Sequence, residues 1–466
     1  MSSSAPGSSG PTVDPAAVRA LVDRARHEDV RLVRFLYVDP SGVTRGKAVH
    51  VAQLASRLRG GVGLTRAQNA INVFDDLVDI DGLESVGEIR LLPDLSTWTR
   101  LPWLRATASV LCEQLGHDGT DWGGCPRSFL ARAIEALAEA GVTVKASFEN
   151  EFYLAELVDG QPVPFGDGPV YSSIGMDRVA AVMDDVVDAL DEQGLQVEQA
   201  INEYGPGQQE ISIRYADAMR AADNQVKFKD TARGVIEVGH GLRASFAPKP
   251  FPDGIGSGAH LHFSLWDVEG RINLLGDPAA SSHTLSALGR NFVAGVLEHL
   301  PALVALTCPS VQSYDRLQPS AWASAFTCWG YDNREAAVRV ASPFWGEEKT
   351  SLNLELKPVD GSANPYLALG GLLVAGLDGV RRGLEPPPPA ERDPARMDEA
   401  ERDRHGVLAL PSDLLSANDL LEKDSVLTEA LGPLLTRCLL ALRRAEYATA
   451  VERGDEWVRA ALFGVF

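Results

Sequence analysis

The chain has 466 residues, of which 45% are hydrophobic and 23% charged, and its formal net charge is −21. This length predicts a main domain with a smaller one, and the composition excludes disorder over most of the chain. The acidic balance argues against binding to nucleic acid or to an anionic membrane. Five scattered cysteines without a CxxC pair predict reduced thiols and a cytoplasmic location.

The amino-terminal residues 1–14 are rich in serine and glycine and have no secretory signal pattern, which predicts a disordered tail. A helix is expected over 15–30, with Asp14 as its cap and Pro15 at its first position. Two strands should follow, joined by a turn at residues 39–42.

Apolar stretches in 85–112 predict further strands, and the Gly-rich segment 115–126 marks a domain boundary. We therefore expect a small domain over 15–122 and a larger one over 123–466. Within the larger one, helices are expected at 127–140, 176–194 and 218–239, and strands at 144–157, 196–215 and 260–267. Strands and helices do not alternate regularly, which favours an α+β fold over a parallel α/β sheet.

Carboxylates occur in two suggestive patterns. Glu149 and Glu151 are two residues apart on an expected strand, so both side chains should point to one face. Glu203 and Glu210 flank a Gly-Pro-Gly turn that would bring them to one end of a hairpin. Each pattern by itself is more typical of a solvated strand edge or a polar turn.

Histidines and arginines add to this set. His260 and His262 share a strand face beside a Gly-rich turn, and Glu355 and Lys357 share another, although each pair alone is more typical of ordinary structure. Three arginines lie in polar motifs: Arg316, Arg334 and Arg339. Oxygen donors with few nitrogens favour Mg²⁺ or Mn²⁺ over zinc. Divalent cations beside arginines are typical of phosphoryl transfer from ATP.

The order of these motifs resembles the glutamine synthetase family over nearly the whole chain after residue 15. The matching segments are LLPDLST, ENEFYL, NEYGPGQQE, GSGAHLHFSL, SYDRL, NREAAVRV and NPYLAL. The resemblance implies a small amino-terminal β-grasp domain and a large α+β catalytic domain. It also implies a homo-oligomer, a dodecamer of two stacked hexameric rings.

The resemblance further implies a two-step ligase reaction. ATP phosphorylates the γ-carboxylate of glutamate, and an amine then attacks the γ-glutamyl phosphate. The implied cofactors are ATP and Mg²⁺ or Mn²⁺, with two to three ions per site. The implied ligands of one metal are Glu151, Glu203 and Glu210, and those of a second are Glu149, His260 and Glu355.

The remaining roles follow from the same resemblance. The implied ATP-binding residues are Glu198, His262, Ser264, Arg334 and Arg339. Glutamate would be held by Gly256, Arg316 and Lys357, and Arg316 and Arg334 would act in catalysis.

Departures from the family pattern lie around the amine and the acid substrate. Trp322 stands where ammonia-using members have a flap glutamate, and an indole offers an apolar wall or a cation–π surface instead of a base. Trp322 packing the flap without further function is the alternative. Asp75 lies near the family's ammonium-site aspartate, and Lys357 and Asn353 each replace an arginine. Leu408 replaces the tyrosine that some members adenylylate, so that control should be absent.

This pattern is similar to the γ-glutamylpolyamine synthetases, including the γ-glutamylputrescine branch. We therefore expect a ligase that joins glutamate to a polyamine. The alternatives are an ammonia-dependent glutamine synthetase, a ligase for a small amine such as ethanolamine, and a non-catalytic relative. The retained metal positions argue against the last.

Overall fold

The computed structural model describes residues 13–277, 279 and 284–466. The predicted tail therefore lies outside the described residues except for Val13 and Asp14. Asp14 caps α1 (Pro15–His27), as expected, because its carboxylate accepts hydrogen bonds from the backbone N–H groups of Ala16, at 2.8 Å, and Ala17.

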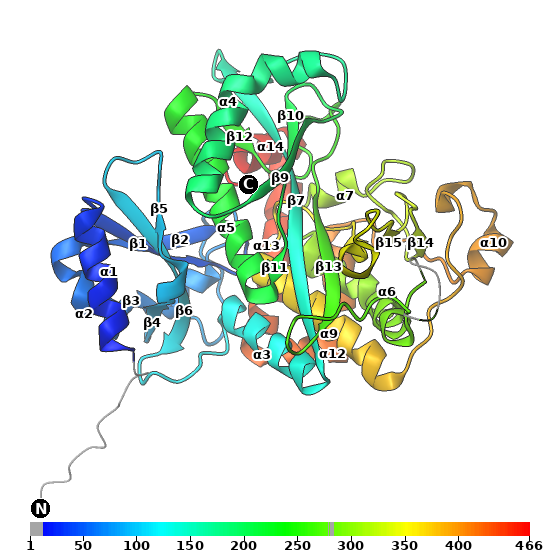
Figure 1. Cartoon of the computed structure of the whole chain (residues 1–466), viewed down its shortest axis with the longest axis horizontal. Coiled ribbons are helices and arrows are strands. Elements are labelled where there is room, and N and C mark those ends of the chain that lie inside the picture. Colours follow the sequence, from blue (N-terminus) through cyan, green and yellow to red (C-terminus); the bar gives the residue numbers. More distant parts are fainter. Residues whose placement is uncertain (1–12, 278, 280–283) are drawn as a thin grey trace, which may run out of the picture.

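The amino-terminal part is a small mixed sheet with helices against it (Figure 1). Its strand order is β2-β1-β6-β4-β3, with β5 paired to β6, and β1 and β6 run parallel. The strands are β1 (Leu32–Val38), β2 (Thr44–His50), β3 (Val62–Thr65), β4 (Glu88–Pro93), β5 (Thr99–Arg100) and β6 (Thr107–Gly116). The helices besides α1 are η1 (Val51–Gln53), α2 (Leu54–Gly60), η2 (Arg66–Ala70) and η3 (Leu95–Thr97).

A large sheet organises the rest of the chain. Its order is β14-β15-β16-β13-β7-β10-β9, and β8, β11 and β12 also pair with the long central strand β7. The strands are β7 (Val142–Val158), β8 (Gln161–Pro164), β9 (Val197–Asn202), β10 (Gln208–Ile213), β11 (Ala216–Asp217), β12 (Arg243–Ser245), β13 (Ala259–Asp267), β14 (Trp329–Tyr331), β15 (Val338–Ala341) and β16 (Asn353–Leu356). Together the two sheets and their helices confirm the expected α+β class.

Helices cover one face of the large sheet. They include α3 (Pro126–Glu139), α5 (Ala218–Gly234), α6 (Ala287–Thr307) and α9 (Pro365–Arg382). Phe148 and Phe152 of β7 are buried in the core, and Asn150 between them exchanges two hydrogen bonds with Gln225 of α5, at 2.8 and 2.6 Å. The alternation of β7 therefore leaves its glutamates on the opposite face, as the sequence predicted.

Helices α6 and α9 pack so closely that only glycine fits at their contact. A Cβ on Gly295 would lie 2.3 Å from the carbonyl oxygen of Ala375 and 2.6 Å from the backbone nitrogen of Gly379. The two helices thus form a tightly packed layer on the covered face of the large sheet. The remaining helical segments are α4 (Ser173–Glu192), the π-helical turn η4 (Val235–Gly239), α7 (Ser313–Arg316), α8 (Glu348–Ser351), η5 (Pro394–Arg396), α10 (Glu399–Arg404), α11 (Leu414–Lys423), α12 (Ser425–Leu431), α13 (Pro433–Arg453) and α14 (Asp455–Phe463).

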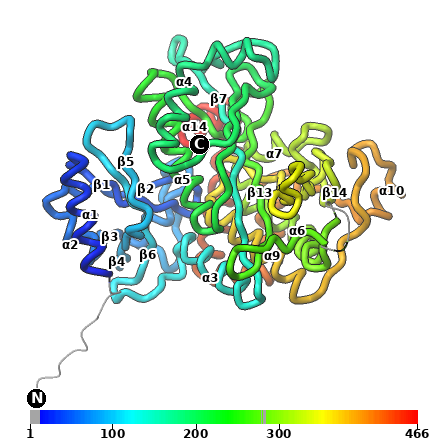
Figure 2. The backbone as a smooth tube through the Cα atoms, in the orientation of Figure 1, coloured from blue at the N-terminus to red at the C-terminus, as the bar shows by residue number. Residues whose placement is uncertain are grey.

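Helix α13, near the carboxyl end of the chain, packs into the cores of both parts of the molecule, which the sequence did not indicate. Cys438 and Leu442 belong to the same buried cluster as the amino-terminal strands. Glu446 accepts hydrogen bonds from the Ser41 hydroxyl at 2.9 Å and from the Val73 backbone N–H at 3.1 Å. The backbone trace shows how the blue amino-terminal part lies beside the rest of the molecule (Figure 2).

All five cysteines are buried free thiols. Among the described residues, no single helix is long and apolar enough to cross a membrane. Helices α12 and α13 together have the length and apolar composition of a membrane span, but the angle between them is 111°.

Candidate active site

Strand register places five of the six predicted metal ligands, all except Glu203, in one row across the large sheet. His260 of β13 lies opposite Glu149 of β7, and Glu210 of β10 lies opposite Glu151 of β7. On the other side, Glu355 of β16 lies opposite both His262 and Arg339. Paired residues on neighbouring strands point to the same face, so backbone pairing alone gathers these side chains.

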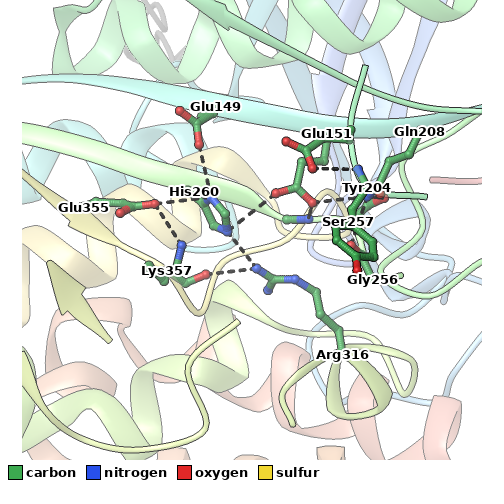
Figure 3. Close-up of polar contacts among 12 residues, drawn as sticks. Glu149, Glu151, Tyr204, Gln208, Gly256, Ser257, His260, Arg316, Glu355 and Lys357 are labelled. Atoms are coloured by element: carbon green, nitrogen blue, oxygen red, sulfur yellow. Dashed lines mark hydrogen bonds and ion pairs between the residues drawn. The ribbon is translucent and has the colours of Figure 1, made fainter. Parts of the chain in front are cut away.

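The first group within this row lies around His260 (Figure 3). Its Nδ1 is 3.2 Å from Glu149 Oε1 and 3.3 Å from Glu355 Oε1. Glu355 is 1% exposed, and it also contacts the Lys357 ammonium at 3.2 Å and the Arg339 guanidinium. Two carboxylates and an imidazole thus face one small volume that is lined by cationic side chains.

The second group contains Glu151, Glu203 and Glu210. Glu151 accepts hydrogen bonds from the Gly258 backbone N–H at 2.9 Å and from Gln208 Nε2 at 3.3 Å. Glu203 follows β9 directly and accepts hydrogen bonds from the Tyr204 N–H at 2.9 Å and from the Tyr171 hydroxyl at 3.3 Å. The Gly-Pro-Gly turn therefore brings Glu203 and Glu210 together, as predicted.

The pKa directions show that these carboxylates repel one another. Burial and the negative charges of Glu149, Glu151, Glu203 and Glu355 raise the pKa of Glu210 to about 10. Burial also raises the pKa of Glu203, and the charge of Glu151 adds to that effect. Burial opposes ionisation of Glu355 as well, but the charges of Lys357 and the two histidines hold its pKa below the ordinary range.

Divalent cations fit this arrangement. Buried carboxylates that face each other without enough positive charge are stabilised by a cation between them. Glu149, His262 and Glu355 each offer a ligand atom, and these atoms lie within 4.8 Å of one another. Oxygen-rich donor sets of this kind suit Mg²⁺ or Mn²⁺.

Arg316 lies beside this volume, on the short helix α7. Its Nη2 donates to His260 Nε2 at 3.1 Å and to the carbonyl oxygen of Lys357 at 3.2 Å. Its Nη1 is buried and has no hydrogen-bond partner among the described residues. A Cβ on Gly256 would lie 2.6 Å from Arg316 Cγ, so the glycine makes room for this side chain.

The predicted ATP-binding residues are distributed over a wider area than the predicted metal ligands. His262 and Arg339 both contact Glu355 and belong to the row, and Ser264 is buried two residues further along β13. Glu198 lies on β9 and makes a long 3.9 Å ion pair with Arg214. Arg334 is exposed in the loop between β14 and β15 and forms no ion pair with any described residue.

The two predicted amine residues are exposed and make no direct contact with the carboxylates of the row among the described residues. Trp322 is 55% exposed and has a positive φ of 56°. Its backbone N–H donates a hydrogen bond to Glu335 Oε1 at 3.0 Å. Asp75 pairs with Arg45 of the amino-terminal sheet at 3.0 Å.

The sequence analysis missed Gln208 and Ser257, and it gave Asn353 no role of its own. Gln208 Nε2 donates to the Gly256 carbonyl at 3.0 Å and to Ser257 Oγ at 3.1 Å, which ties the turn before β10 to the Gly-rich turn before β13. Asn353 was noted only because it stands where the family has an arginine. Its Oδ1 lies 2.9 Å from His262 Nδ1. The position of Gln208 beside the Gly-Pro-Gly turn was a usable signal, whereas no local pattern joined Asn353 to His262.

The chain matches two family profiles that follow each other along the sequence. Residues 15–126 match the glutamine synthetase N-terminal domain, and residues 123–461 match the glutamine synthetase catalytic domain. The gamma-glutamylpolyamine synthetase GlnA3 of Streptomyces coelicolor is 38% identical over 465 residues, which is 99% of each chain. The glutamine synthetase of Pyrococcus abyssi is 34% identical, covering 86% of this chain and 87% of its own.

Comparison with solved structures points to the same family. A structure described as a novel glutamine synthase homolog superposes with a TM-score of 0.83 at 34% identity, over 94% of this chain and 99% of that one. A GmaS/ADP complex superposes with a TM-score of 0.81 at 29% identity, over 94% of this chain and 98% of that one. With both domains, the carboxylate row and these relatives in agreement, the chain belongs to the glutamine synthetase family and is a glutamate–amine ligase that depends on ATP.

Proposed function

We propose that this enzyme joins the γ-carboxylate of glutamate to a polyamine. The observation that carries the proposal is Trp322, an exposed indole at the position where ammonia-using members have a flap glutamate. An indole face attracts an alkylammonium group through its π-electrons and its apolar surface, whereas it cannot take a proton from ammonium. The 38% identity to a gamma-glutamylpolyamine synthetase over nearly the whole chain supports the same choice.

The residues of the row act as the binding machinery for the first step. Mg²⁺ or Mn²⁺ ions, two to three per site, would neutralise the phosphates of ATP and the γ-carboxylate, which otherwise repel each other. Glu151, Glu203 and Glu210 would hold one ion, and Glu149, His260 and Glu355 another. The positive charge of Lys357, and to a smaller extent that of Arg339, holds the pKa of Glu355 below its ordinary range against burial, which favours its role as an oxygen donor.

Arg316 holds the glutamate. Its unpartnered Nη1 is the donor that a substrate carboxylate would accept from, and Gly256 keeps its side chain in place. Glu198, His262, Ser264 and Arg339 are proposed to contact the nucleotide, and Arg334 the phosphoryl group as it is transferred.

We also propose the homo-oligomer, a dodecamer of two stacked rings, as the active form. Asp75 is exposed and pairs with Arg45 of the amino-terminal sheet, so it is available to complete the amine site of a neighbouring subunit. The five buried free thiols support a reducing compartment such as the cytoplasm.

Phosphate release from ATP tests the proposal. The reaction contains glutamate, Mg²⁺ and one amine from a panel of ammonium, putrescine, cadaverine, spermidine, spermine and ethanolamine. Polyamines should give turnover, with Trp322→Phe close to the wild type and Trp322→Glu weaker with polyamines. Trp345→Glu, which changes another exposed tryptophan, is the matched control.

The second candidate is an ammonia-dependent glutamine synthetase, which the 34% identity to the Pyrococcus abyssi enzyme favours. Turnover with ammonium alone would replace the polyamine proposal by this one. Turnover with ethanolamine alone would make the enzyme a ligase for a small amine.

A further inference from the structure

Two carboxylates from other segments hold the flap around Trp322. Ser320, Trp322 and Ser324 each have a positive φ, between 56° and 66°, which residues other than glycine rarely adopt. Such a backbone persists only where neighbouring groups hold it. The Ser320 hydroxyl donates to Asp393 Oδ2 at 2.8 Å, and the Trp322 N–H donates to Glu335 Oε1 at 3.0 Å.

The two carboxylates differ in their other contacts. Asp393 Oδ1 caps η5 by accepting a hydrogen bond from the Ala395 N–H at 2.9 Å, and Arg396 lies 3.7 Å from its Oδ2. Glu335 is half-buried, forms no ion pair with any described residue, and has no partner among them for its Oε2. A half-buried carboxylate with a free oxygen and no cation beside it is suited to receive a positively charged group.

The loop between β14 and β15 fixes the position of Glu335. Asn333 Nδ2 donates to the carbonyl oxygens of Ala390, at 2.8 Å, and Arg392, at 3.1 Å. The Oδ1 of the same amide accepts a hydrogen bond from the Glu335 N–H at 3.0 Å. Glu335 directly follows Arg334, the residue proposed to contact the phosphoryl group during its transfer.

The same loop leads into the proposed reaction site. Two residues after Glu335, the carbonyl oxygen of Ala337 accepts a hydrogen bond from the Lys357 N–H at 3.0 Å. The Lys357 ammonium contacts Glu355 at 3.2 Å, and its carbonyl oxygen accepts a hydrogen bond from Arg316 at 3.2 Å. Glu335 therefore connects the flap to the strands that carry the metal-binding and glutamate-binding side chains.

The surroundings of Glu335 favour proton transfer. Burial raises the pKa of Glu335 above its ordinary value, and the Trp322 N–H opposes this in part. The negative charge of Asp393 raises the pKa further, and the positive charge of Lys357 lowers it slightly. The Cys328 thiol, which the charge of Glu335 also affects, has a pKa of about 12, mainly through burial, and stays protonated. A carboxylate whose pKa is raised toward neutrality accepts protons more readily than an ordinary one.

We propose that Glu335 accepts the proton that the amine substrate must lose, in place of the flap glutamate that Trp322 replaces. The inference rests on the proposed function, because its reactants are an amine and γ-glutamyl phosphate. The ammonium group gives one proton to Glu335, and the freed lone pair of its nitrogen forms the C–N bond with the γ-carbonyl carbon. The C–O bond to phosphate breaks, its electron pair stays on the phosphate, and a second proton of the nitrogen leaves with the phosphate. Glu335 then releases its proton to water.

A base at this point is consistent with a preference for polyamines. The Trp322 indole would hold the alkyl chain and so bring the terminal ammonium group to Glu335. An ammonium ion has no alkyl chain for the indole to hold, so it gains less from the same carboxylate.

Turnover with two kinds of nucleophile tests the proposal. Spermine is cationic at neutral pH and must lose a proton before it attacks, whereas hydroxylamine is uncharged there and needs no base. Glu335→Gln keeps an oxygen that accepts the Trp322 N–H, Glu335→Asp keeps a carboxylate, and Glu335→Ala loses both. Glu391→Gln is the matched control, because Glu391 is an exposed glutamate between the two residues whose carbonyl groups bind Asn333.

Glu335→Gln should lower kcat/KM for spermine about 100-fold or more and leave hydroxamate formation from hydroxylamine close to that of the wild type. The loss with spermine should shrink as the pH rises, because more of the amine is then uncharged. Glu335→Asp should keep part of the spermine activity, and Glu391→Gln should match the wild type with both nucleophiles. Circular dichroism checks folding, and if Glu335→Gln does not fold, the ratio of spermine to hydroxylamine turnover in Glu335→Asp decides the question.

Full spermine turnover by Glu335→Gln would overturn the proposal while leaving the proposed function intact. Equal losses with spermine and hydroxylamine would also overturn it, because they would show that Glu335 only holds the flap. If the wild type uses ammonium alone, the polyamine function fails, and the same comparison with ammonium in place of spermine decides the role of Glu335. A wild type without turnover of any nucleophile would contradict both proposals.

Discussion

Arg316 hydrogen-bonds the ring of His260, with 3.1 Å between its Nη2 and His260 Nε2. The same guanidinium presents a buried Nη1 that has no partner among the described residues. One side chain therefore connects the proposed metal site to the proposed glutamate site. Arginine can serve both because its five donors are fixed in a planar fork.

Replacing Arg316 by lysine should weaken glutamate binding far more than metal binding. Lysine keeps the charge but cannot reach the histidine and the substrate carboxylate at once. The loss of a charge-assisted hydrogen bond, about 1.5–3 kcal/mol, predicts a fall in kcat/KM for glutamate of about 10- to 150-fold. Steady-state kinetics and Mn²⁺ titration measure the two effects. Equal losses in both would show that Arg316 is structural.

Gly256→Ala should have a similar but indirect effect. The new Cβ would lie 2.6 Å from Arg316 Cγ and 3.0 Å from its Cβ, so the arginine must move. We expect the KM for glutamate to rise about tenfold, because a small misplacement of a binding group is costly. Gly123→Ala is the control, since nothing lies within 4 Å of a Cβ there. An unchanged KM would mean that Arg316 does not bind glutamate.

Two-residue spacing was sufficient to predict that the glutamates of β7 share one face, whereas the grouping of all the carboxylates as metal ligands followed only from the family resemblance. Glu149 and Glu151 needed only β7, and Glu203 and Glu210 only a hairpin turn. The contact of Asn353 with His262 joins strands that are distant in the sequence, so no local pattern indicates it. The packing of α13 into the amino-terminal core is likewise a tertiary contact that hydrophobic periodicity cannot reveal.

Glu210→Gln should stabilise the metal-free protein while weakening its response to metal. Burial and the neighbouring carboxylates raise the pKa of Glu210 to about 10, so near neutral pH the metal-free protein must take up a proton on folding, and the neutral amide removes that cost. We expect the metal-free melting temperature to rise by about 1–2 °C. Mg²⁺ or Mn²⁺ should raise the melting temperature of the wild type more than that of the variant, because ions that bind only the folded state stabilise it. A variant that is less stable without metal would contradict the role of charge repulsion.

His299 should make stability depend on pH. Its Nδ1 lies 2.6 Å from Asp424 Oδ2, and its Nε2 lies 3.1 Å from Asp378 Oδ2. Arg382 also forms an ion pair with Asp378. Burial opposes its protonation, but the two aspartates raise its pKa above the ordinary value, while the pKa values of both aspartates are lowered. A raised histidine pKa stabilises the fold below about pH 6.5, and this stabilisation is lost as the pH rises through the folded value.

The aspartates act in the opposite sense, since their contribution is lost as the pH falls through their lowered pKa values. His299→Gln should therefore cost several degrees of melting temperature at about pH 5.5 and less at about pH 8.5. Thermal melts of both proteins at the two pH values measure this. A cost that does not change with pH would show that His299 is neutral in the folded state.

Competition between amines tests the central claim most directly. The enzyme is supplied with ATP, Mg²⁺, glutamate and equal concentrations of ¹⁵N-ammonium and spermine, and the products are identified by mass spectrometry. The account predicts γ-glutamylspermine as the main product, because Trp322 favours an alkylammonium group and offers no base to ammonium. Labelled glutamine as the main product would contradict it and would identify the chain as a glutamine synthetase with a divergent flap.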